Sequence, residues 1–251
     1  MNALLPWLRG LRLVIHLLVG LTLAAAVGLS FGKLQPEPLI RWWSEILLEI
    51  FDIRLAVHGR GLAGQRVLVA NHISWLDIPV IGALEATRFV AKSEIRDWPI
   101  AGWLARAAGT FFIQRGKGGA RPLLERAAPH LAAGGSFVFF PEGTTTDGRQ
   151  VLRFHPRLFA AAADNGVPVQ PIALRYSGEV APFIGEDDLV SHILRLLKQP
   201  RLTVEVSYCV PLSGLQRETL ATHAEQVIRA AAVRESPIAP ADEPGLEPLA
   251  A

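Results

Sequence analysis

Hydrophobic residues form one long run near the start of this chain. Between Leu13 and Phe31 there is no Lys, Arg, Asp or Glu, and His16 is the one titratable side chain. A helix needs about 20 apolar residues to cross a bilayer core, so this run can span a membrane or enter it deeply. Basic residues stand on both sides, so the positive-inside rule gives no orientation. We expect an uncleaved anchor, with cleavage after Ala24-Ala25-Ala26 as the alternative.

A second segment, residues 39–51, has apolar residues at helical spacing and the adjacent tryptophans Trp42 and Trp43. Tryptophan favours the membrane–water interface. The alternative is a helix packed on the rest of the protein. The two segments together predict a membrane-associated helical hairpin.

From Ile53 onward, short apolar runs alternate with stretches of helical periodicity. Such alternation is typical of an α/β fold. We expect a mostly parallel central sheet of about seven strands flanked by helices. The predicted strands are 53–58, 66–70, 87–91, 109–114, 136–140, 169–174 and 202–209. The predicted helices are 76–84, 99–107, 119–133, 155–165, 186–197 and 215–233.

These patterns divide the chain into three parts. Residues 1–52 form the membrane-associated helices and residues 53–235 the α/β domain. Residues 236–251, rich in Pro, Ala and Glu, have the composition of a disordered tail.

Composition narrows the function classes. The single cysteine, Cys209, excludes a disulfide framework within the chain, and no Cys/His cluster has zinc spacing, so no metal site is expected. Net charge is +2, but the charge is uneven. Between Arg88 and Arg126 the basic residues outnumber three acids (Glu94, Asp97 and Glu125). Either this is a solvated basic face or it attracts phosphate groups of lipids or substrate. The basic residues are Arg88, Lys92, Arg96, Arg106, Arg115, Lys117, Arg121 and Arg126.

The apolar run 67–70 is followed by Asn71-His72-Ile73-Ser74-Trp75-Leu76-Asp77. The carboxyl end of a buried strand in an α/β sheet is a usual place for a ligand site. A histidine there can accept a proton, and a nearby carboxylate can fix its tautomer. Five residues exceed one helical turn, so the two side chains meet only in a distorted first turn. The alternative is a plain turn in which Ser74 caps a helix.

Two further strands end in polar residues. The run 137–140 leads into Pro141-Glu142-Gly143-Thr144-Thr145-Thr146-Asp147-Gly148, where backbone N–H groups could face an anion and Glu142 could accept from hydroxyls. The run 109–114 ends at Arg115, a residue type suited to phosphate. A surface turn and a solvated arginine are the alternatives. No Gly-x-Ser-x-Gly elbow, P-loop or Gly-x-Gly-x-x-Gly fingerprint is present.

Four blocks, in order, resemble the bacterial lysophospholipid acyltransferases, the 1-acyl-sn-glycerol-3-phosphate acyltransferase (PlsC-like) family. The blocks are NHISWLD (71–77), GTFFIQR (109–115), FPEGTTTDG (140–148) and VPVQPIAL (167–174). The resemblance covers roughly residues 40–215. It implies a membrane-bound O-acyltransferase of phospholipid biosynthesis at the cytoplasmic face of the bacterial inner membrane. The partners would be a membrane lysolipid and an acyl-CoA or acyl carrier protein donor, with no other cofactor and no nucleic acid.

The resemblance also implies residue roles. His72 would be the general base that deprotonates the lysolipid hydroxyl, and Asp77 would orient it. Arg115, Glu142 and Gly143 would bind the headgroup, with Thr144 and Pro171 in support.

One segment departs from the family pattern. Many phosphatidate-forming members have Phe-Lys-x-Gly after the third block, whereas this chain has Phe154-His155-Pro156-Arg157. Arg153 or Arg157 could replace the lysine. The stretch 89–115 also resembles members that act on lyso-ornithine lipid. That acceptor is the alternative to 1-acyl-sn-glycerol-3-phosphate. A non-catalytic lipid-binding protein and a lipid esterase are alternatives of other classes.

Overall fold

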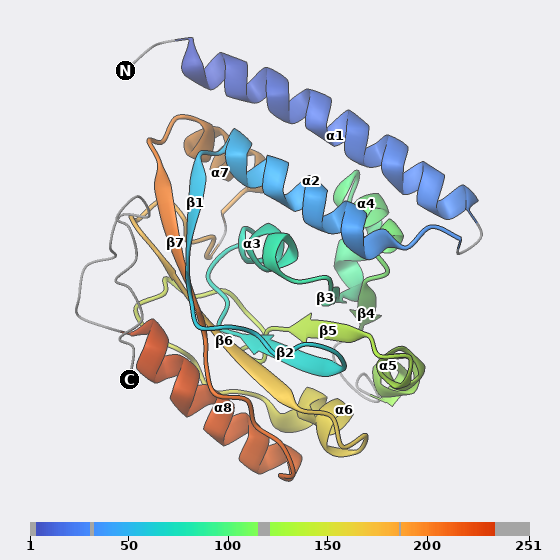
Figure 1. Cartoon of the computed structure of the whole chain (residues 1–251). Helices are drawn as coiled ribbons and strands as arrows, with labels where there is room; N and C mark the ends of the chain where they lie inside the picture. Colours follow the sequence, from blue (N-terminus) through green and yellow to red (C-terminus); the bar gives the residue numbers. More distant parts are fainter. Residues whose placement is uncertain (1–3, 31–32, 115–120, 186, 234–251) are drawn as a thin grey trace, which may run out of the picture.

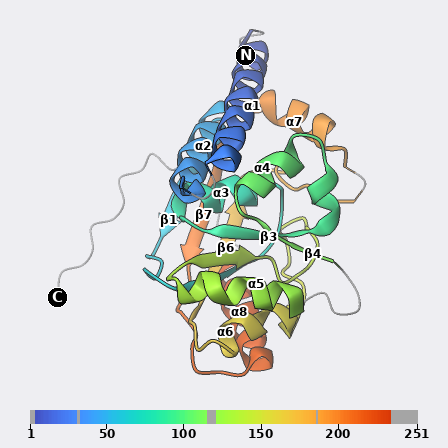
Figure 2. The same cartoon turned by 90° about the vertical axis from the view of Figure 1, so that its right-hand side faces the viewer.

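The structure is a computed structural model that describes residues 4–30, 33–114, 121–185 and 187–233. A seven-stranded sheet with the order β1-β7-β6-β2-β5-β3-β4 forms its centre, with helices on both faces (Figures 1 and 2). The strands are β1 (Ile53–His58), β2 (Arg66–Ala70), β3 (Arg88–Lys92), β4 (Phe111–Ile113), β5 (Ser136–Phe139), β6 (Val169–Tyr176) and β7 (Leu202–Tyr208). The predicted α/β class and the positions of all seven strands are confirmed.

The sheet is parallel except at one junction. From β6 to β4 all neighbours are parallel, and β1 is parallel to β7, but β7 is antiparallel to β6. The carboxyl ends of β2, β3, β5 and β6 therefore lie along one edge of the sheet. The carboxyl ends of β1 and β7 lie along the opposite edge.

Strand β2 runs through the middle of the sheet and divides two cores. Leu68 and Ala70 face the core under α2 (Pro36–Ile50), α3 (Asp77–Leu84) and α7 (Leu189–Leu197). Val67 and Val69 face the core under α5 (Arg121–Ala132), α6 (Ala160–Ala163) and α8 (Arg217–Ala232). All four side chains are fully buried. This explains why β2 reads as a continuous apolar run.

One predicted helix is shorter than expected. Residues 155–165 form a 3-10 turn, η2 (Pro156–Phe159), followed by the four-residue α6. The α-helix is short because its first predicted turn is 3-10; beyond it, the chain turns at Gly166, whose φ of 63° lies in the left-handed region that glycine tolerates.

Helix α2 links the N-terminal helix to the domain. It packs on α3, where a Cβ at Gly82 would lie 2.8 Å from the Ser44 hydroxyl. On its other side it contacts α1 (Leu5–Leu29): the rings of His16 and Trp43 stack at 4.5 Å, and Trp43 Nε1 donates to the His16 carbonyl. Residues 39–51 thus pack on the domain, the alternative that the sequence left open, and the expected helical hairpin is present.

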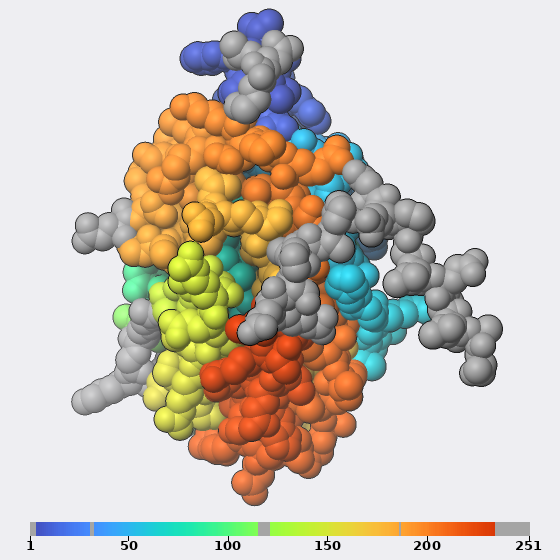
Figure 3. Space-filling model, turned by 90° about the vertical axis from the view of Figure 1, so that its left-hand side faces the viewer, coloured from blue at the N-terminus to red at the C-terminus, as the bar shows by residue number. Residues whose placement is uncertain are grey.

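Helix α1 exposes apolar side chains on one face and contacts the domain through the other. The mean hydropathy of its most apolar 18-residue window is 2.0, and only 17% of that window is buried. Among the described residues, α1 is the one helix long and apolar enough to cross a membrane. Its buried Arg9 donates to the Gln199 carbonyl and pairs with Asp52. Figure 3 shows α1 projecting at one end of the molecule, with α8 toward the other. The outward side chains include Trp7, Leu8, Leu11, Val14, Ile15, Leu18 and Leu29.

Asn71 extends the pairing of β2 with β6 beyond the last residue of β2. Its side-chain amide donates to the Leu174 carbonyl (3.0 Å) and its Oδ1 accepts from the Leu174 N–H (2.8 Å). The residue is 1% exposed, so water cannot replace these bonds. Asn71 therefore fixes where the chain leaves the sheet, one residue before His72.

We predict that Asn71→Ala lowers the free energy of unfolding by about 2–4 kcal/mol, because two buried backbone groups lose their partners. Asn165→Ala is the matched control. Asn165 is exposed and donates to the Ala161 carbonyl, so its loss should change stability by only about 0.5 kcal/mol. Urea unfolding of the detergent-solubilised protein measures both. Equal losses for the two variants would contradict the role of Asn71.

Candidate active site

His72 and Asp77 are brought together at the carboxyl end of β2. The His72 Nδ1 lies 2.7 Å from Asp77 Oδ2. The same oxygen accepts from the backbone N–H groups of Ile73 (2.7 Å) and Ser74 (3.0 Å). The connecting loop thus wraps around the carboxylate, and α3 begins only at Asp77. The conformation of this loop, and not a shared helix face, brings the side chains of His72 and Asp77 together across five residues.

The alternative of a turn capped by Ser74 is wrong. The residue before α3 is Leu76, and no side chain caps this helix. The Ser74 hydroxyl is buried and has no hydrogen-bond partner among the described residues. The side chain that organises the turn is Asp77.

A third side chain completes the arrangement. The hydroxyl of Tyr176, the last residue of β6, donates to Asp77 Oδ1 at 2.7 Å. Burial, followed by the charge of Asp77, raises the pKa of Tyr176 well above its ordinary value, so the phenol stays protonated. The backbone N–H groups can only donate, and the carboxylate can only accept. A neutral His72 must then donate from Nδ1, which leaves Nε2 without a proton.

The Nε2 edge of the His72 imidazole is accessible from outside the protein. Its ring stacks on Phe140 with centroids 4.0 Å apart and an interplanar angle of 12°. The side chain is 20% exposed, whereas that of Asp77 is completely buried. No hydrogen bond joins Nε2 to any residue that the structure describes. Nε2 is therefore available to accept a proton from a molecule outside the protein.

Glu142 braces the site from the neighbouring strand. Its Oε1 accepts from the His72 N–H at 2.7 Å and its Oε2 from the Leu152 N–H at 2.8 Å. These partners are backbone amides, whereas we expected hydroxyls. Burial raises the pKa of Glu142, and the two N–H bonds oppose that rise. The contact ties the loop after β5 to the backbone of His72, which explains the position of a carboxylate next to Pro141.

The rest of this loop surrounds the same backbone. Thr146 donates its N–H to the His72 carbonyl at 2.8 Å. Gly143 has a φ of 72°, where a side chain would strain the turn, and Thr144 is exposed. Arg115, the remaining predicted headgroup residue, lies outside the described residues. Headgroup binding by Glu142, Gly143 and Thr144 stays a prediction.

The segment that departs from the family pattern lies beside this loop. The His155 N–H donates to the Pro141 carbonyl at 3.0 Å, and the side chains of Arg153, His155 and Arg157 are exposed.

Across the described part of the chain, no group of three or more His, Cys, Asp or Glu side chains could hold a metal ion.

Comparison with known proteins places these residues in a family. The family model described as Acyltransferase matches residues 54–175, which include His72, Asp77 and Glu142. The chain is 43% identical over 237 residues to the lyso-ornithine lipid O-acyltransferase of Pseudomonas aeruginosa, covering 89% of this chain and 92% of the relative. The corresponding enzyme of Rhodobacter capsulatus is 35% identical, with 88% of each chain covered.

A second group of relatives has a different name. The 1-acyl-sn-glycerol-3-phosphate acyltransferase of Neisseria meningitidis is 30% identical over 237 residues, covering 91% of this chain and 84% of the relative. Among solved structures, the 1-acyl-sn-glycerophosphate acyltransferase PlsC of Thermotoga maritima has the same fold, with a TM-score of 0.63 at 22% identity. That alignment covers 89% of this chain and 96% of PlsC. The chain therefore belongs to the acyltransferase family that contains lyso-ornithine lipid and 1-acyl-sn-glycerol-3-phosphate acyltransferases.

Proposed function

We propose that this enzyme transfers an acyl chain from an acyl-CoA or acyl carrier protein thioester to the free hydroxyl of a lysolipid, with His72 as general base. The observation that carries this proposal is the His72–Asp77 contact, which leaves Nε2 unprotonated on a partly exposed ring. Asp77 orients the ring and balances the charge that it gains.

The reaction needs no acyl-enzyme. As the lysolipid oxygen attacks the thioester carbonyl, its proton moves to His72 Nε2 and a tetrahedral oxyanion forms. When the C–S bond breaks, the thiolate leaves and takes the proton from the imidazolium, which restores the neutral base. Asp77 keeps its hydrogen bonds throughout, because the donors around it come from the protein.

Two observations favour lyso-ornithine lipid as the acceptor. The relatives with that name are 43% and 35% identical to this chain, against 30% for the 1-acyl-sn-glycerol-3-phosphate acyltransferase of Neisseria meningitidis. In addition, His155 and Pro156 stand where many phosphatidate-forming enzymes carry a lysine pattern. The second candidate is 1-acyl-sn-glycerol-3-phosphate, for which the exposed Arg153 and Arg157 could supply phosphate contacts.

The enzyme is membrane-associated, and we infer that α1 lies within one leaflet at the cytoplasmic face. Helix α1 contacts α2, α4 (Ala101–Ala107) and α7 of the domain. Helix α2 carries Glu37, Arg41 and Glu45, so a bilayer-crossing α1 would bring these charges toward hydrocarbon. Both thioester donors are cytoplasmic molecules, which supports that face.

We predict that the purified enzyme acylates lyso-ornithine lipid at least about 10-fold faster than 1-acyl-sn-glycerol-3-phosphate. We also predict that His72→Ala lowers the rate of acyl transfer by about 10²–10⁴-fold without loss of fold, because the general base is removed. The measurement uses both acceptors with labelled acyl-CoA and acyl carrier protein, and circular dichroism controls for folding. Thioester consumption that does not depend on an acceptor would indicate an esterase. Near wild-type transfer by His72→Ala would exclude the proposed base.

We predict that Tyr176→Phe lowers kcat about 10-fold with little change in KM for the acceptor, because Asp77 Oδ1 loses its donor in a buried position. Tyr208→Phe is the matched control, since Tyr208 also donates to a carboxylate, that of Glu85, away from His72. A merely structural tyrosine would give equal effects at both positions. Steady-state kinetics on vesicle-bound acceptor separate the two results.

A further inference from the structure

The turn that follows β3 exposes three large apolar side chains. It consists of the 3-10 turn η1 (Ser93–Asp97) and helix α4. Trp98, Ile100 and Trp103 are 42%, 44% and 56% exposed. We call this segment the α4 turn (residues 93–107). Within the described chain, no other segment covers these three side chains fully. Exposed apolar side chains that lie close together often mark a surface that binds a partner or a membrane.

The α4 turn is held in one shape by its backbone. Ile100 has a φ of 62°, which is rare for a β-branched residue. The N–H of Ala101 bonds to the Pro99 carbonyl, and that of Gly102 to the Trp98 carbonyl. A Cβ at Gly102 would lie 2.3 Å from the Arg96 carbonyl oxygen, so the helix start packs directly on η1. Ile100 thus combines an unfavourable backbone conformation with an exposed side chain.

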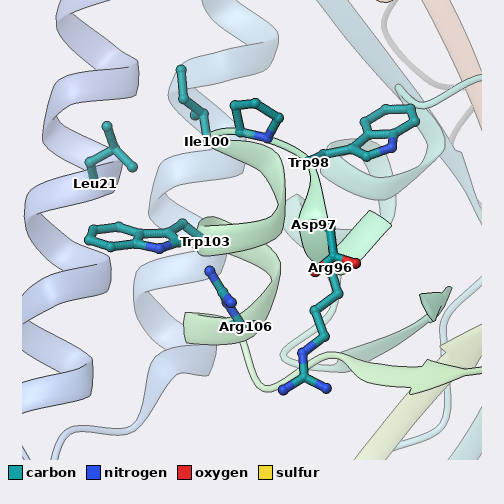
Figure 4. Close-up of a pocket in the computed structure, with 8 residues that line it drawn as sticks. Leu21, Arg96, Asp97, Trp98, Ile100, Trp103 and Arg106 are labelled. Atoms are coloured by element: carbon teal, nitrogen blue, oxygen red, sulfur yellow. The ribbon is translucent and has the colours of Figure 1, made fainter. Parts of the chain in front are cut away.

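Beside these side chains lies an open groove of about 400 Å³ that α4 shares with α1. Figure 4 shows Trp103 directed toward α1 and Leu21, while Trp98 extends from the other side of the turn. Leu21 lies one helical turn after the exposed Leu18. The apolar surface of α1 thus continues onto the α4 turn.

The groove also carries charge that is not neutralised. Arg96 and Arg106 line it, against the single acid Asp97. Within the described ranges neither arginine has an ion-pair partner. By contrast, Arg88 pairs with Glu37 and Arg121 with Glu125. The basic stretch seen in the sequence therefore contains a subset of arginines that is free to bind phosphate groups.

The position of the α4 turn relates it to the active site. It follows the carboxyl end of β3, which lies along the same edge of the sheet as the carboxyl end of β2 and hence His72. A lysolipid acceptor resides in a membrane. A surface that draws this edge to the bilayer would bring Nε2 of His72 close to the acceptor's headgroup.

We propose that the α4 turn is a second membrane-insertion element: Trp98, Ile100 and Trp103 enter the headgroup region of an anionic bilayer, and Arg96 and Arg106 bind lipid phosphates. Tryptophan favours that depth, and arginines beside an apolar surface are attracted to anionic lipids. The proposal extends the membrane attachment by α1 and goes beyond the proposed acyl transfer. Its tests require no turnover, so its failure and that of the catalytic proposal are distinguishable.

The first test places an environment-sensitive fluorophore (NBD) on Trp103→Cys in the full chain, in a Cys209→Ser background. The control label is on Val210→Cys. Val210 is 73% exposed and follows β7, whose carboxyl end lies on the opposite edge of the sheet. In phosphatidylglycerol-containing vesicles we expect a blue shift and quenching by nitroxide lipids at 103 and neither at 210. Equal behaviour of the two labels would overturn the proposal, and circular dichroism checks folding.

The second test concerns the arginines. Arg96→Gln and Arg106→Gln should each weaken vesicle binding about 5-fold when phosphatidylglycerol is present, and neither should change binding to neutral vesicles. Arg60→Gln is the matched control, because Arg60 is exposed and follows β1 on the opposite edge. Unchanged binding of both Gln variants to anionic vesicles would overturn the part of the proposal that assigns phosphate binding to Arg96 and Arg106.

Discussion

The rest of the site depends on the hydrogen bonds that the buried carboxylate of Asp77 accepts. Four donors surround it: the imidazole of His72, the backbone N–H groups of Ile73 and Ser74, and the hydroxyl of Tyr176. A buried charge is tolerated only when hydrogen bonds of this kind satisfy it. The same bonds that stabilise the carboxylate also shape the loop and select the histidine tautomer. One set of hydrogen bonds therefore determines both the conformation of the loop and the protonation pattern of His72.

Three adjacent strands of the sheet supply the residues of the site. Strand β2 delivers His72, β6 delivers Tyr176, and β5 leads to Glu142, which holds the His72 backbone from the other side. Asn71 fixes the exit from β2 by its two bonds to Leu174. Because the strands are parallel, their carboxyl ends meet at one edge, and residues about 100 positions apart come into contact there. The second strand group, β1 and β7, runs the other way and has no part in the site.

Much of this could be predicted from sequence, for identifiable reasons. The runs 67–70 and 137–140 are apolar on both faces, so they marked buried strands, and His72 and Asp77 stood directly after one of them. The alternative in which Ser74 caps a helix was wrong, because the carboxylate of Asp77, and not the serine hydroxyl, accepts from the backbone N–H groups of this turn. Tyr176 was missed because its contact depends on the register between β6 and β2, for which a single sequence has no local signal.

The central claim is that Asp77 fixes His72 as a base with a bare Nε2. A long-range ¹H–¹⁵N NMR spectrum of the histidine-labelled enzyme tests it, with the His72 signals assigned by difference against His72→Gln. At a pH where the ring is neutral, we expect a protonated Nδ1 and an unprotonated Nε2, and a loss of this preference in Asp77→Asn. A proton on Nε2 in the wild-type enzyme would contradict the account.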